Sequence, residues 1–196
     1  MDETEQAGLT YARLHPKSGP NSLVAEALDI VRAPSGRALD IGAGPLNDTS
    51  YLLQAGLEVE AVDTDPYTLT LAAEMNDPRL TVVHADVRDV TIAPAAYRLV
   101  VAIHLFPFLP RADLGQVAHA ITDGLCGGGV LCCTFLGRED SWARTRPHMT
   151  FMSAAQVLRA FPHLRLVTLR EERYDGLTAA RQPKRWHVFR CLFRKD

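Results

Sequence analysis

The sequence predicts a single α/β domain in which helices cover both faces of a mostly parallel β-sheet. Short apolar runs rich in β-branched residues alternate with segments of helical period along most of the chain, an order typical of βαβ units. The 196 residues, 47% of them hydrophobic, suit one domain with its own core, and no repeat or low-complexity linker divides them. We therefore expect a three-layer sandwich that spans residues 1–196.

The charge and hydropathy of the chain argue against several classes of partner. The formal net charge is −2, which gives no electrostatic reason to expect nucleic acid or an acidic membrane as the main partner. No run approaches the ~20 apolar residues that a membrane span needs. The first residues, Met1–Glu5, are acidic and polar, unlike a secretory signal. We expect a cytoplasmic protein, and the sequence leaves its oligomeric state open.

The four cysteines indicate neither a disulfide framework nor a metal site. None of them forms a Cys-x-x-Cys pair, and no histidine cluster stands at metal-ligand spacing. Cys132 and Cys133 lie inside an apolar run, where a free cysteine behaves as a small hydrophobic residue. We expect reduced cysteines in the core and no bound metal.

The first two thirds of the chain follow the alternation of helix and strand in order. Asn21 and Ser22 precede apolar residues at helical spacing, which indicates a helix with an N-cap. A Pro-Ser-Gly break at 34–36 separates this helix from the first strand. The expected strands are 37–41, 59–62, 80–84, 97–103 and 130–135. The expected helices between them are 46–55, which Gly56 closes, one that begins at Asp65–Pro66, and 111–125. Gly127–Gly129 are expected to lead from the last of these helices into the last strand.

The last third has a different order. A short helix at 153–160 precedes two strand-like runs at 164–174 and 186–192, with turn residues but no convincing helix between them. Consecutive strands without a crossover helix pair antiparallel, so we expect these two runs to form a pair at one edge of the sheet.

A glycine-rich turn follows the first expected strand, in the run Leu39-Asp40-Ile41-Gly42-Ala43-Gly44-Pro45. Glycines at such a turn let a ligand lie against bare backbone at the carboxyl end of the sheet. An isolated match of this kind serves packing alone about as often as binding.

Two acidic residues strengthen the ligand-binding interpretation. Asp63 ends the second strand, 21 residues after Gly42, where an acid is placed to accept hydrogen bonds from ribose hydroxyls. Capping of the next helix is the alternative, but Thr64 and Asp65 stand closer to that helix and leave Asp63 free. Asp86 follows the third strand, where its carboxylate could accept the amine of adenine; the alternative is a solvated loop acid.

The turn distinguishes between two adenosyl cofactors. A nicotinamide-binding fingerprint needs a glycine where Asn47 stands. Pro45 also removes an amide donor that would hold a pyrophosphate at the helix N-terminus. S-adenosylmethionine has no phosphate, so neither change would weaken its binding. The sequence therefore favours S-adenosylmethionine over NAD.

Taken in order, these segments resemble class I S-adenosylmethionine-dependent methyltransferases over residues 21–136. Within that class, the short N-terminal helix and the compact length resemble the small tellurite-resistance methyltransferase group. The resemblance implies a Rossmann-like fold with a seven-stranded, mostly parallel sheet and an antiparallel last strand. The segments that carry it are Leu39–Gly44, Val62-Asp63, Ala85-Asp86-Val87, Tyr97–Val101 and Gly127–Leu131.

The resemblance also assigns roles to individual residues. Asp63 would bind the ribose, Ile103 and His104 would flank the sulfonium and the substrate entrance, and a third glycine is usual where Leu46 stands. The residues implied at the methionine portion are Asp40, Gly42, Ala43 and Gly44, and those implied at the adenine are Thr64, Asp86 and Val87.

The segment after the fourth strand, 103–110, is apolar and aromatic and lacks the Asp/Asn-Pro-Pro-aromatic signature that resembles methylation of DNA bases. It suits a dry site for a small organic acceptor. His104 is the candidate general base, since its ordinary pKa lies near neutrality, and a structural histidine bonded to the backbone is the alternative. Methyl transfer from a sulfonium depends chiefly on in-line placement, so no base is strictly required.

Two polar segments border the expected acceptor site. The connection 137–152 has no clear period, as in many binding loops, and carries Trp142, Arg144, Arg146 and His148. The run Lys184-Arg185-Trp186-His187 is interpreted mainly as a solvated strand edge that blocks pairing between sheets.

The sequence therefore predicts a methyltransferase that uses S-adenosyl-L-methionine, releases S-adenosyl-L-homocysteine and acts on a small-molecule acceptor. A non-catalytic module that binds the adenosyl cofactor and an NAD-dependent oxidoreductase are the alternatives. The expected division is an N-terminal helical segment (1–34), a cofactor-binding core (35–136), and a substrate loop with the final strand pair (137–196).

Overall fold

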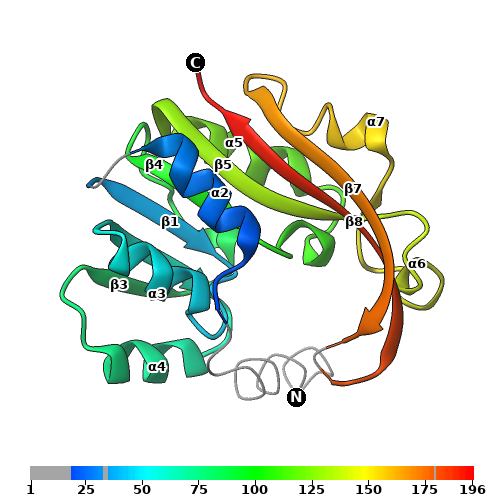
Figure 1. Ribbon diagram of the computed structural model, residues 1–196, viewed down its shortest axis with the longest axis horizontal. Coiled ribbons are helices and arrows are strands. Elements are labelled where there is room, and N and C mark those ends of the chain that lie inside the picture. Colours follow the sequence, from blue (N-terminus) through cyan, green and yellow to red (C-terminus); the bar gives the residue numbers. More distant parts are fainter. Residues whose placement is uncertain (1–18, 33–34, 179) are drawn as a thin grey trace.

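The computed structural model describes residues 19–32, 35–178 and 180–196, which form one eight-stranded sheet covered by helices (Figure 1). The strand order is β3-β2-β1-β4-β5-β8-β7, and β6 pairs with β5 outside this path. The strands are β1 (Arg37–Ile41), β2 (Glu58–Asp63), β3 (Leu80–His84), β4 (Tyr97–Ala102), β5 (Leu125–Gly137), β6 (Phe151–Met152), β7 (Arg165–Leu177) and β8 (Pro183–Arg194).

Two helical layers sandwich the sheet, as the sequence predicts. One layer packs against a sheet face through apolar side chains such as Leu23 and Leu52, and the opposite layer does so through side chains such as Ile121 and Val157. The first layer holds α2 (Ser22–Val31), α3 (Asn47–Gln54) and α4 (Tyr67–Met75); the second holds α5 (Leu114–Gly124), α7 (Ala154–Val157) and the 3-10 turn η2 (Phe106–Phe108).

The central strands are buried on both faces, which explains their nearly continuous apolar sequences. In β1, Ala38 packs toward α2 and α3, whereas Leu39 and Ile41 pack toward the α5 side. Each large aliphatic side chain buried in this way contributes about 1.5–3 kcal/mol to stability. The parallel pairs β1–β2, β2–β3, β1–β4 and β4–β5 bring the carboxyl ends of these strands to one end of the sheet.

The antiparallel last strand is confirmed. β8 pairs antiparallel with both β5 and β7, so the two late strands form the expected pair at one edge, and they curve together along one side of the molecule (Figure 1). Both strands are longer than predicted. The edge strand β7 carries charges of both signs that discourage pairing with another sheet, among them Arg170, Glu171, Glu172 and Arg173.

Several predicted boundaries are wrong. Gly127–Gly129 lie inside β5 and not in a turn before it, where the β4–β5 register is irregular. The predicted helix at 153–160 ends at Val157, and the chain continues in turns to Phe161, which is buried in the core and precedes Pro162. The connection 137–152 contains the short helix α6 (Trp142–Thr145) as well as β6.

The cysteines agree with the prediction of a reduced core. Cys132, Cys133 and Cys191 are buried and free, and Cys126 is half-buried. Among the described residues, no helix is long and apolar enough to cross a membrane.

Candidate functional site

The glycine turn lies between β1 and α3 at the carboxyl end of the sheet. Gly42 and Gly44 both have positive φ, at 76° and 47°, a conformation that residues with a Cβ adopt reluctantly. The amide of Gly42 donates to the carbonyl of Val62 at 2.8 Å, so the turn is fastened to β2. Ala43 is buried beneath the turn. Sequence and structure therefore agree that glycine is needed here for backbone shape.

Leu46 stands where the resembling family has a third glycine, and it adopts the left-handed conformation with φ at 60°. A left-handed backbone costs about 1–2 kcal/mol at a residue with a side chain. The side chain of Leu46 is 1% exposed and packs with Ala61, which offsets that cost by an amount of similar size. The leucine therefore keeps the glycine-like backbone and gains a core contact.

Asp63 joins the glycine turn to the end of β2. One carboxylate oxygen accepts the amide of Gly44 at 2.7 Å, and the other accepts the amide of Asp65 at 2.8 Å. The expectation that Asp63 is free of local bonds is therefore wrong, although each oxygen keeps a second lone pair for a ligand. Burial raises the pKa of Asp63, and the backbone amides of Asp65 and Gly44 oppose that rise.

Asp40 lies beneath the turn and is 2% exposed. Its carboxyl accepts a hydrogen bond from the hydroxyl of Thr49 at 2.6 Å. Burial, with the nearby carboxylates of Asp48 and Asp63, raises the pKa of Asp40 to about 7, against the lowering effect of the Thr49 bond. Asp40 is therefore partly protonated near neutral pH.

Further acidic groups surround the turn. Asp48 accepts the backbone amide of Asn21 at 2.6 Å, which ties the start of α2 to α3. Asp65 uses one oxygen to accept the amide of Tyr67 at 2.9 Å. The other oxygen of Asp65 is buried without a hydrogen-bond partner in the described part of the chain. A buried acceptor of this kind is suited to a donor from a bound group.

The residues predicted to bind adenine lie at the ends of β2 and β3, near Asp63, and have other partners. The amide of Ala85 donates to the carbonyl of Asp63 at 3.0 Å, so the two strand ends are adjacent. The Asp86 carboxylate pairs with Arg88 through bonds of 3.0 and 2.8 Å and caps the 3-10 turn η1 (Val87–Asp89). The Arg88 guanidinium lowers the pKa of Asp86. Val87 is buried, and Thr64 is exposed with its carbonyl bonded to a ring nitrogen of His84.

His104 follows β4, and the next residue, Leu105, lies close to the glycine turn. The backbone of His104 is left-handed, with φ at 56°, and its amide donates to the hydroxyl of Thr134 at 2.8 Å. The side chain of Leu105 lies over Gly42, 3.9 Å from where a Cβ would stand. Ile103 is half-buried against the α2 side of the sheet. The segment 103–105 and the glycine turn therefore face each other across the ends of β1 and β4.

Burial and two nearby cations, Arg190 and Lys184, lower the pKa of His104 to about 4. The ring is neutral at pH 7 and binds a proton weakly.

Sequence reasoning missed a buried polar cluster beside this segment. The side chains of Asp140 and Lys184 form an ion pair, and both are fully buried. Lys184 is therefore not part of a solvated edge, and that interpretation is also wrong for His187, which is 4% exposed. No local signal could pair two residues that lie 44 positions apart.

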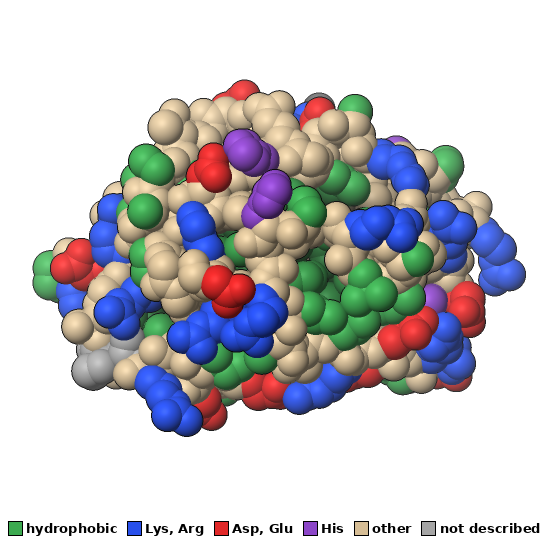
Figure 2. Space-filling model, turned by 90° about the horizontal axis from the view of Figure 1, so that it is seen from above, with side chains coloured by type: hydrophobic (Ala, Val, Ile, Leu, Met, Phe, Trp, Pro, Cys, Tyr) green, Lys and Arg blue, Asp and Glu red, His purple; other side chains and the backbone are tan. Residues whose placement is uncertain are grey.

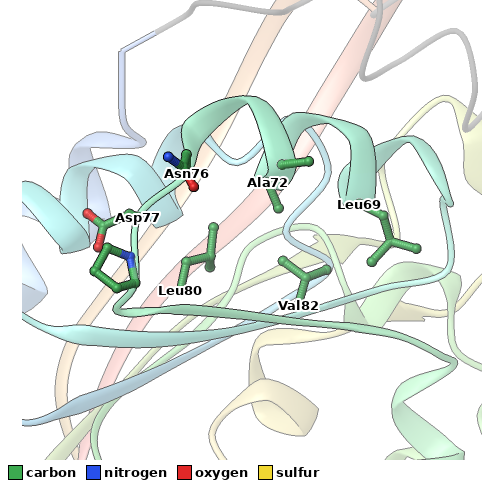
Figure 3. A pocket seen from close by; sticks show the side chains of 8 residues that line it. Leu69, Ala72, Asn76, Asp77, Leu80 and Val82 are labelled. Carbon is green, nitrogen blue, oxygen red and sulfur yellow. The ribbon is translucent and has the colours of Figure 1, made fainter.

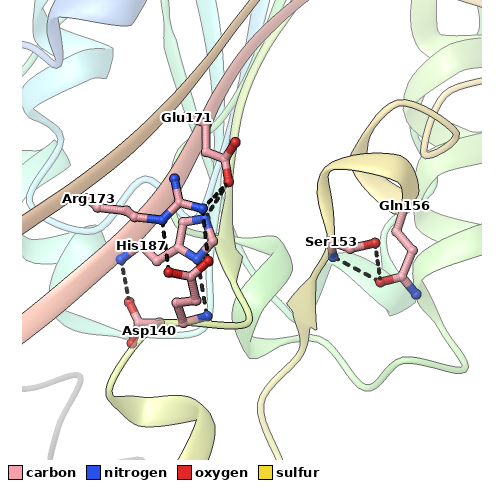
Figure 4. A network of polar contacts seen from close by, with 7 residues as sticks. Asp140, Ser153, Gln156, Glu171, Arg173 and His187 are labelled. Carbon is pink, nitrogen blue, oxygen red and sulfur yellow. Dashed lines mark hydrogen bonds and ion pairs between the residues drawn. The ribbon is translucent and has the colours of Figure 1, made fainter.

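Figure 4 shows the polar contacts that extend from Asp140 to His187, Glu171 and Arg173. The amide of His187 donates to Asp140 at 3.2 Å. Its Nδ1 accepts the amide of Glu139 at 3.1 Å, so Nε2 carries the proton and donates to Glu171 at 2.9 Å. Arg173 pairs with Glu139 and Glu171 at the exposed end. The network fastens the segment after β5 to the strand pair β7–β8.

Two surface hollows lie apart from the glycine turn. One, of about 520 Å³, lies between α4 and β3 and is lined by Leu69, Ala72 and Val82, among others (Figure 3). The other, of about 250 Å³, lies between η2, α5 and α7 and is lined by Phe106 and Phe135, among others. Neither includes a predicted site residue. On the face seen in Figure 2, hydrophobic side chains gather in an area bordered by charged ones.

Comparisons with known proteins agree with this arrangement. Residues 38–129 match a family model described as a methyltransferase domain. The structure of 1,6-didemethyltoxoflavin-N1-methyltransferase from Burkholderia thailandensis, with bound 1,6-didemethyltoxoflavin and S-adenosylhomocysteine, is similar with a TM-score of 0.68 and 18% identity, over 89% of this chain and 77% of that chain.

Two further solved structures share the fold. TehB from Haemophilus influenzae is similar with a TM-score of 0.77 and 14% identity, over 93% of this chain and 64% of that chain. The [4+2]-cyclase SpnF is similar with a TM-score of 0.69 and 12% identity, over 89% of this chain and 80% of that chain. The predicted Rossmann-like α/β fold is thereby confirmed.

The raised pKa of Asp40 predicts how stability depends on pH. Because its folded pKa of about 7 exceeds its ordinary value of 3.8, the folded chain binds this proton more tightly than the unfolded chain. Asp40 therefore contributes stability at low pH that is lost as pH rises from about 4 to about 7. Between those limits, wild type should lose about 2–4 kcal/mol of unfolding free energy relative to Asp40→Asn.

Urea unfolding of wild type and Asp40→Asn across this pH range measures the difference. Asparagine keeps an oxygen that can accept the Thr49 hydroxyl, so local geometry is preserved. If the unfolding free energies of wild type and Asp40→Asn change in parallel with pH, the pKa of Asp40 is not raised in the folded chain.

Proposed function

We propose that this chain, a methyltransferase-domain protein with the class I fold, binds S-adenosyl-L-methionine and transfers its methyl group to a small organic acceptor. The reaction would release S-adenosyl-L-homocysteine. The observation that carries the proposal is the Asp63 carboxylate, which bridges the bare glycine turn and the end of β2. A carboxylate beside exposed backbone at the carboxyl ends of adjacent parallel strands suits a ribose and the chain attached to it.

The residues around the turn fit this cofactor. The buried, unpartnered oxygen of Asp65 is an acceptor that a ribose hydroxyl could satisfy beside Asp63. We assign Asp63 to the ribose and Ile103 to the space beside the sulfonium. The residues assigned to the methionine portion are Asp40, Gly42, Ala43 and Gly44, and those assigned to the adenine are Thr64, Asp86 and Val87.

Electrostatics favour a cationic cofactor over NAD. Asp48, Asp63 and Asp65 add negative charge near the turn, and Asp40 adds more as it ionises. Within a few ångströms of several carboxylates, a positive sulfonium is attracted, and a doubly negative pyrophosphate is repelled. When bound, S-adenosylmethionine supplies an electrophilic methyl group on sulfur.

His104 is suited to positioning the acceptor more than to removing its proton. With a pKa of about 4, the ring is a weak base at neutral pH. In-line displacement at a sulfonium depends mainly on placing the acceptor's lone pair opposite the leaving sulfur. The expected catalytic contribution of His104 is therefore contact with the acceptor and exclusion of water.

The similar structures support a small acceptor without fixing the reaction. The Burkholderia enzyme is named for methylation of a small heteroaromatic compound, and its structure holds S-adenosylhomocysteine. SpnF is named a [4+2]-cyclase, so the fold also accommodates other chemistry. A non-catalytic module that binds the adenosyl cofactor is the second candidate, because the carboxylates around the turn support binding alone.

Cofactor choice is tested by thermal unfolding with S-adenosylmethionine, S-adenosylhomocysteine and NAD. A ligand present at 100 times its Kd stabilises the folded chain by about 2.7 kcal/mol. We expect the two sulfur compounds to raise the midpoint and NAD to leave it unchanged. A rise with NAD alone would support an oxidoreductase. Formation of S-adenosylhomocysteine with a labelled methyl donor and a metabolite library separates an enzyme from a binding module.

Removal of the Asp63 carboxylate should weaken cofactor binding. Asp63→Ala leaves the ribose hydroxyls without their acceptor, at a cost of about 1–3 kcal/mol, or about 5- to 150-fold in Kd. Calorimetric titration with S-adenosylhomocysteine measures the change. Asp29→Ala removes an exposed acid on α2 as the matched control. Equal Kd values for Asp63→Ala and wild type would reject the ribose assignment.

Replacement of His104 should reduce turnover only modestly. Loss of a general base typically costs about 10²–10⁴-fold, and a base with so low a pKa supplies little of that. We expect His104→Gly, which also accepts the positive φ, to retain turnover within about tenfold of wild type. A loss above a hundredfold, with S-adenosylhomocysteine affinity unchanged, would restore the general-base role.

A further inference from the structure

The ion pair between Asp140 and Lys184 lies under two aromatic rings. Asp140 accepts the amides of Trp142 at 3.0 Å and His187 at 3.2 Å as well as pairing with the lysine. The ammonium of Lys184 lies 4.1 Å from the ring centroid of Trp142 and 4.1 Å from that of Trp186. Cation–π contacts on both indoles therefore fix the relative position of the two rings.

This arrangement reaches the residues that face the glycine turn. The ring of Trp186 lies 6.0 Å from the ring of His104, tilted by 43°. Tyr174 of β7 stacks on Trp186 from another side at 6.2 Å. Since Leu105 lies over Gly42, a path of direct contacts runs from the turn through the segment after β4 to Trp186. An acceptor held opposite the sulfonium would meet the ring of His104 first and that of Trp186 next.

Positive charge borders the same rings. Lys184 is neutralised by Asp140. The guanidinium carbon of Arg146, however, lies 4.3 Å from the ring centroid of Trp142, and Arg144 is in the last turn of α6. Both arginines are exposed, and neither has a carboxylate partner within the described part of the chain. Arginine that is held on an aromatic face by stacking presents its N–H groups to anions.

We propose that His104 and Trp186 form the surface that binds the methyl acceptor, and that the acceptor is an aromatic molecule that carries a negative charge. The inference rests on the proposed function and adds the substrate class. Aromatic rings recognise another ring by offset or edge contacts, and the unpaired arginines select for an anionic group.

The chemistry of transfer agrees with an anionic acceptor. A lone pair on the acceptor's oxygen forms a bond to the methyl carbon as the carbon–sulfur bond breaks and its electrons pass to sulfur. The sulfonium becomes a neutral thioether, and a carboxylate or phenolate becomes a neutral ester or ether. No proton has to leave the acceptor, so the weak basicity of His104 is no obstacle.

The two tryptophans of the chain, Trp142 and Trp186, provide a direct readout. In Trp142→Phe, Trp186 is the sole tryptophan, and phenylalanine keeps a ring beside Lys184. The probes are 4-hydroxybenzoate, its neutral analogue 4-hydroxybenzamide, and the non-aromatic anion cyclohexanecarboxylate. We expect 4-hydroxybenzoate to change Trp186 emission saturably, at a concentration at least tenfold lower than either analogue requires. Equal responses to the three probes, or no saturable response to 4-hydroxybenzoate, would overturn the proposal.

Arginine variants test the charge requirement. Arg146→Gln should weaken 4-hydroxybenzoate binding at least fivefold and leave S-adenosylhomocysteine affinity unchanged. Arg159→Gln, at an exposed arginine in the turn after α7, is the matched control and should change neither. Unchanged probe affinity in Arg146→Gln would remove the anionic requirement.

Titrations are run with and without S-adenosylhomocysteine, and wild type is titrated in parallel in case Trp142→Phe does not fold. Absence of S-adenosylhomocysteine binding by calorimetry refutes the proposed function. Binding of S-adenosylhomocysteine without a response at Trp186 refutes the acceptor surface alone.

Discussion

The contact between the Asp63 carboxylate and the amide of Gly44 joins the glycine turn to the end of β2, where the cofactor is proposed to bind. β1 and β2 are fixed by their ladder, but the turn after β1 has positive φ at Gly42 and Gly44 and makes no ladder of its own. A charge-assisted hydrogen bond from an amide to a partly buried carboxylate is stronger than one between neutral groups. It therefore fixes the bare backbone at a set distance from the acid that ends β2, and the proposed ribose site depends on that distance.

The proposed site is electrostatically divided between its two sides. Carboxylates crowd the turn at one side, and the pKa of Asp63 is raised because their burial is costly. At the other side, burial lowers the pKa of His104, and Arg190 and Lys184 lower it further, although Lys184 is itself paired with Asp140. A cationic sulfonium on the acidic side and an anionic acceptor on the basic side would each lie near opposite charge, and the reaction would neutralise both. The division thus stabilises the bound, charged reactants; it does not drive transfer, because these attractions are lost as the charges are neutralised.

The sequence predicted the fold better than the site. β1 and β3 were predicted with correct bounds because they are short apolar runs between strong turn residues. The glycine turn and Asp63 were found because their spacing is local. The hydrogen-bond partners of Asp63 were not predicted, because the capping rules favoured Thr64 and Asp65 as caps of the next helix and left Asp63 without a local role. The buried pairing of Asp140 with Lys184 was also missed, because a charged run at a strand end has the same composition whether it is solvated or enclosed.

Left-handed backbone occurs on both sides of the proposed site, at Leu46 and His104, although neither is glycine. Four other described residues with side chains also have positive φ, among them the helix C-caps Arg32 and Asn76, so the conformation alone does not identify the site. Left-handed backbone at such residues persists only where the surroundings demand it, and it is concentrated at functional sites. For Leu46, burial of the side chain offsets the cost. His104 has a hydrogen bond from its amide to Thr134, but its own ring is buried beside cations that oppose its protonation. Under the proposed function, this conformation places the ring 6.0 Å from that of Trp186, at the acceptor surface.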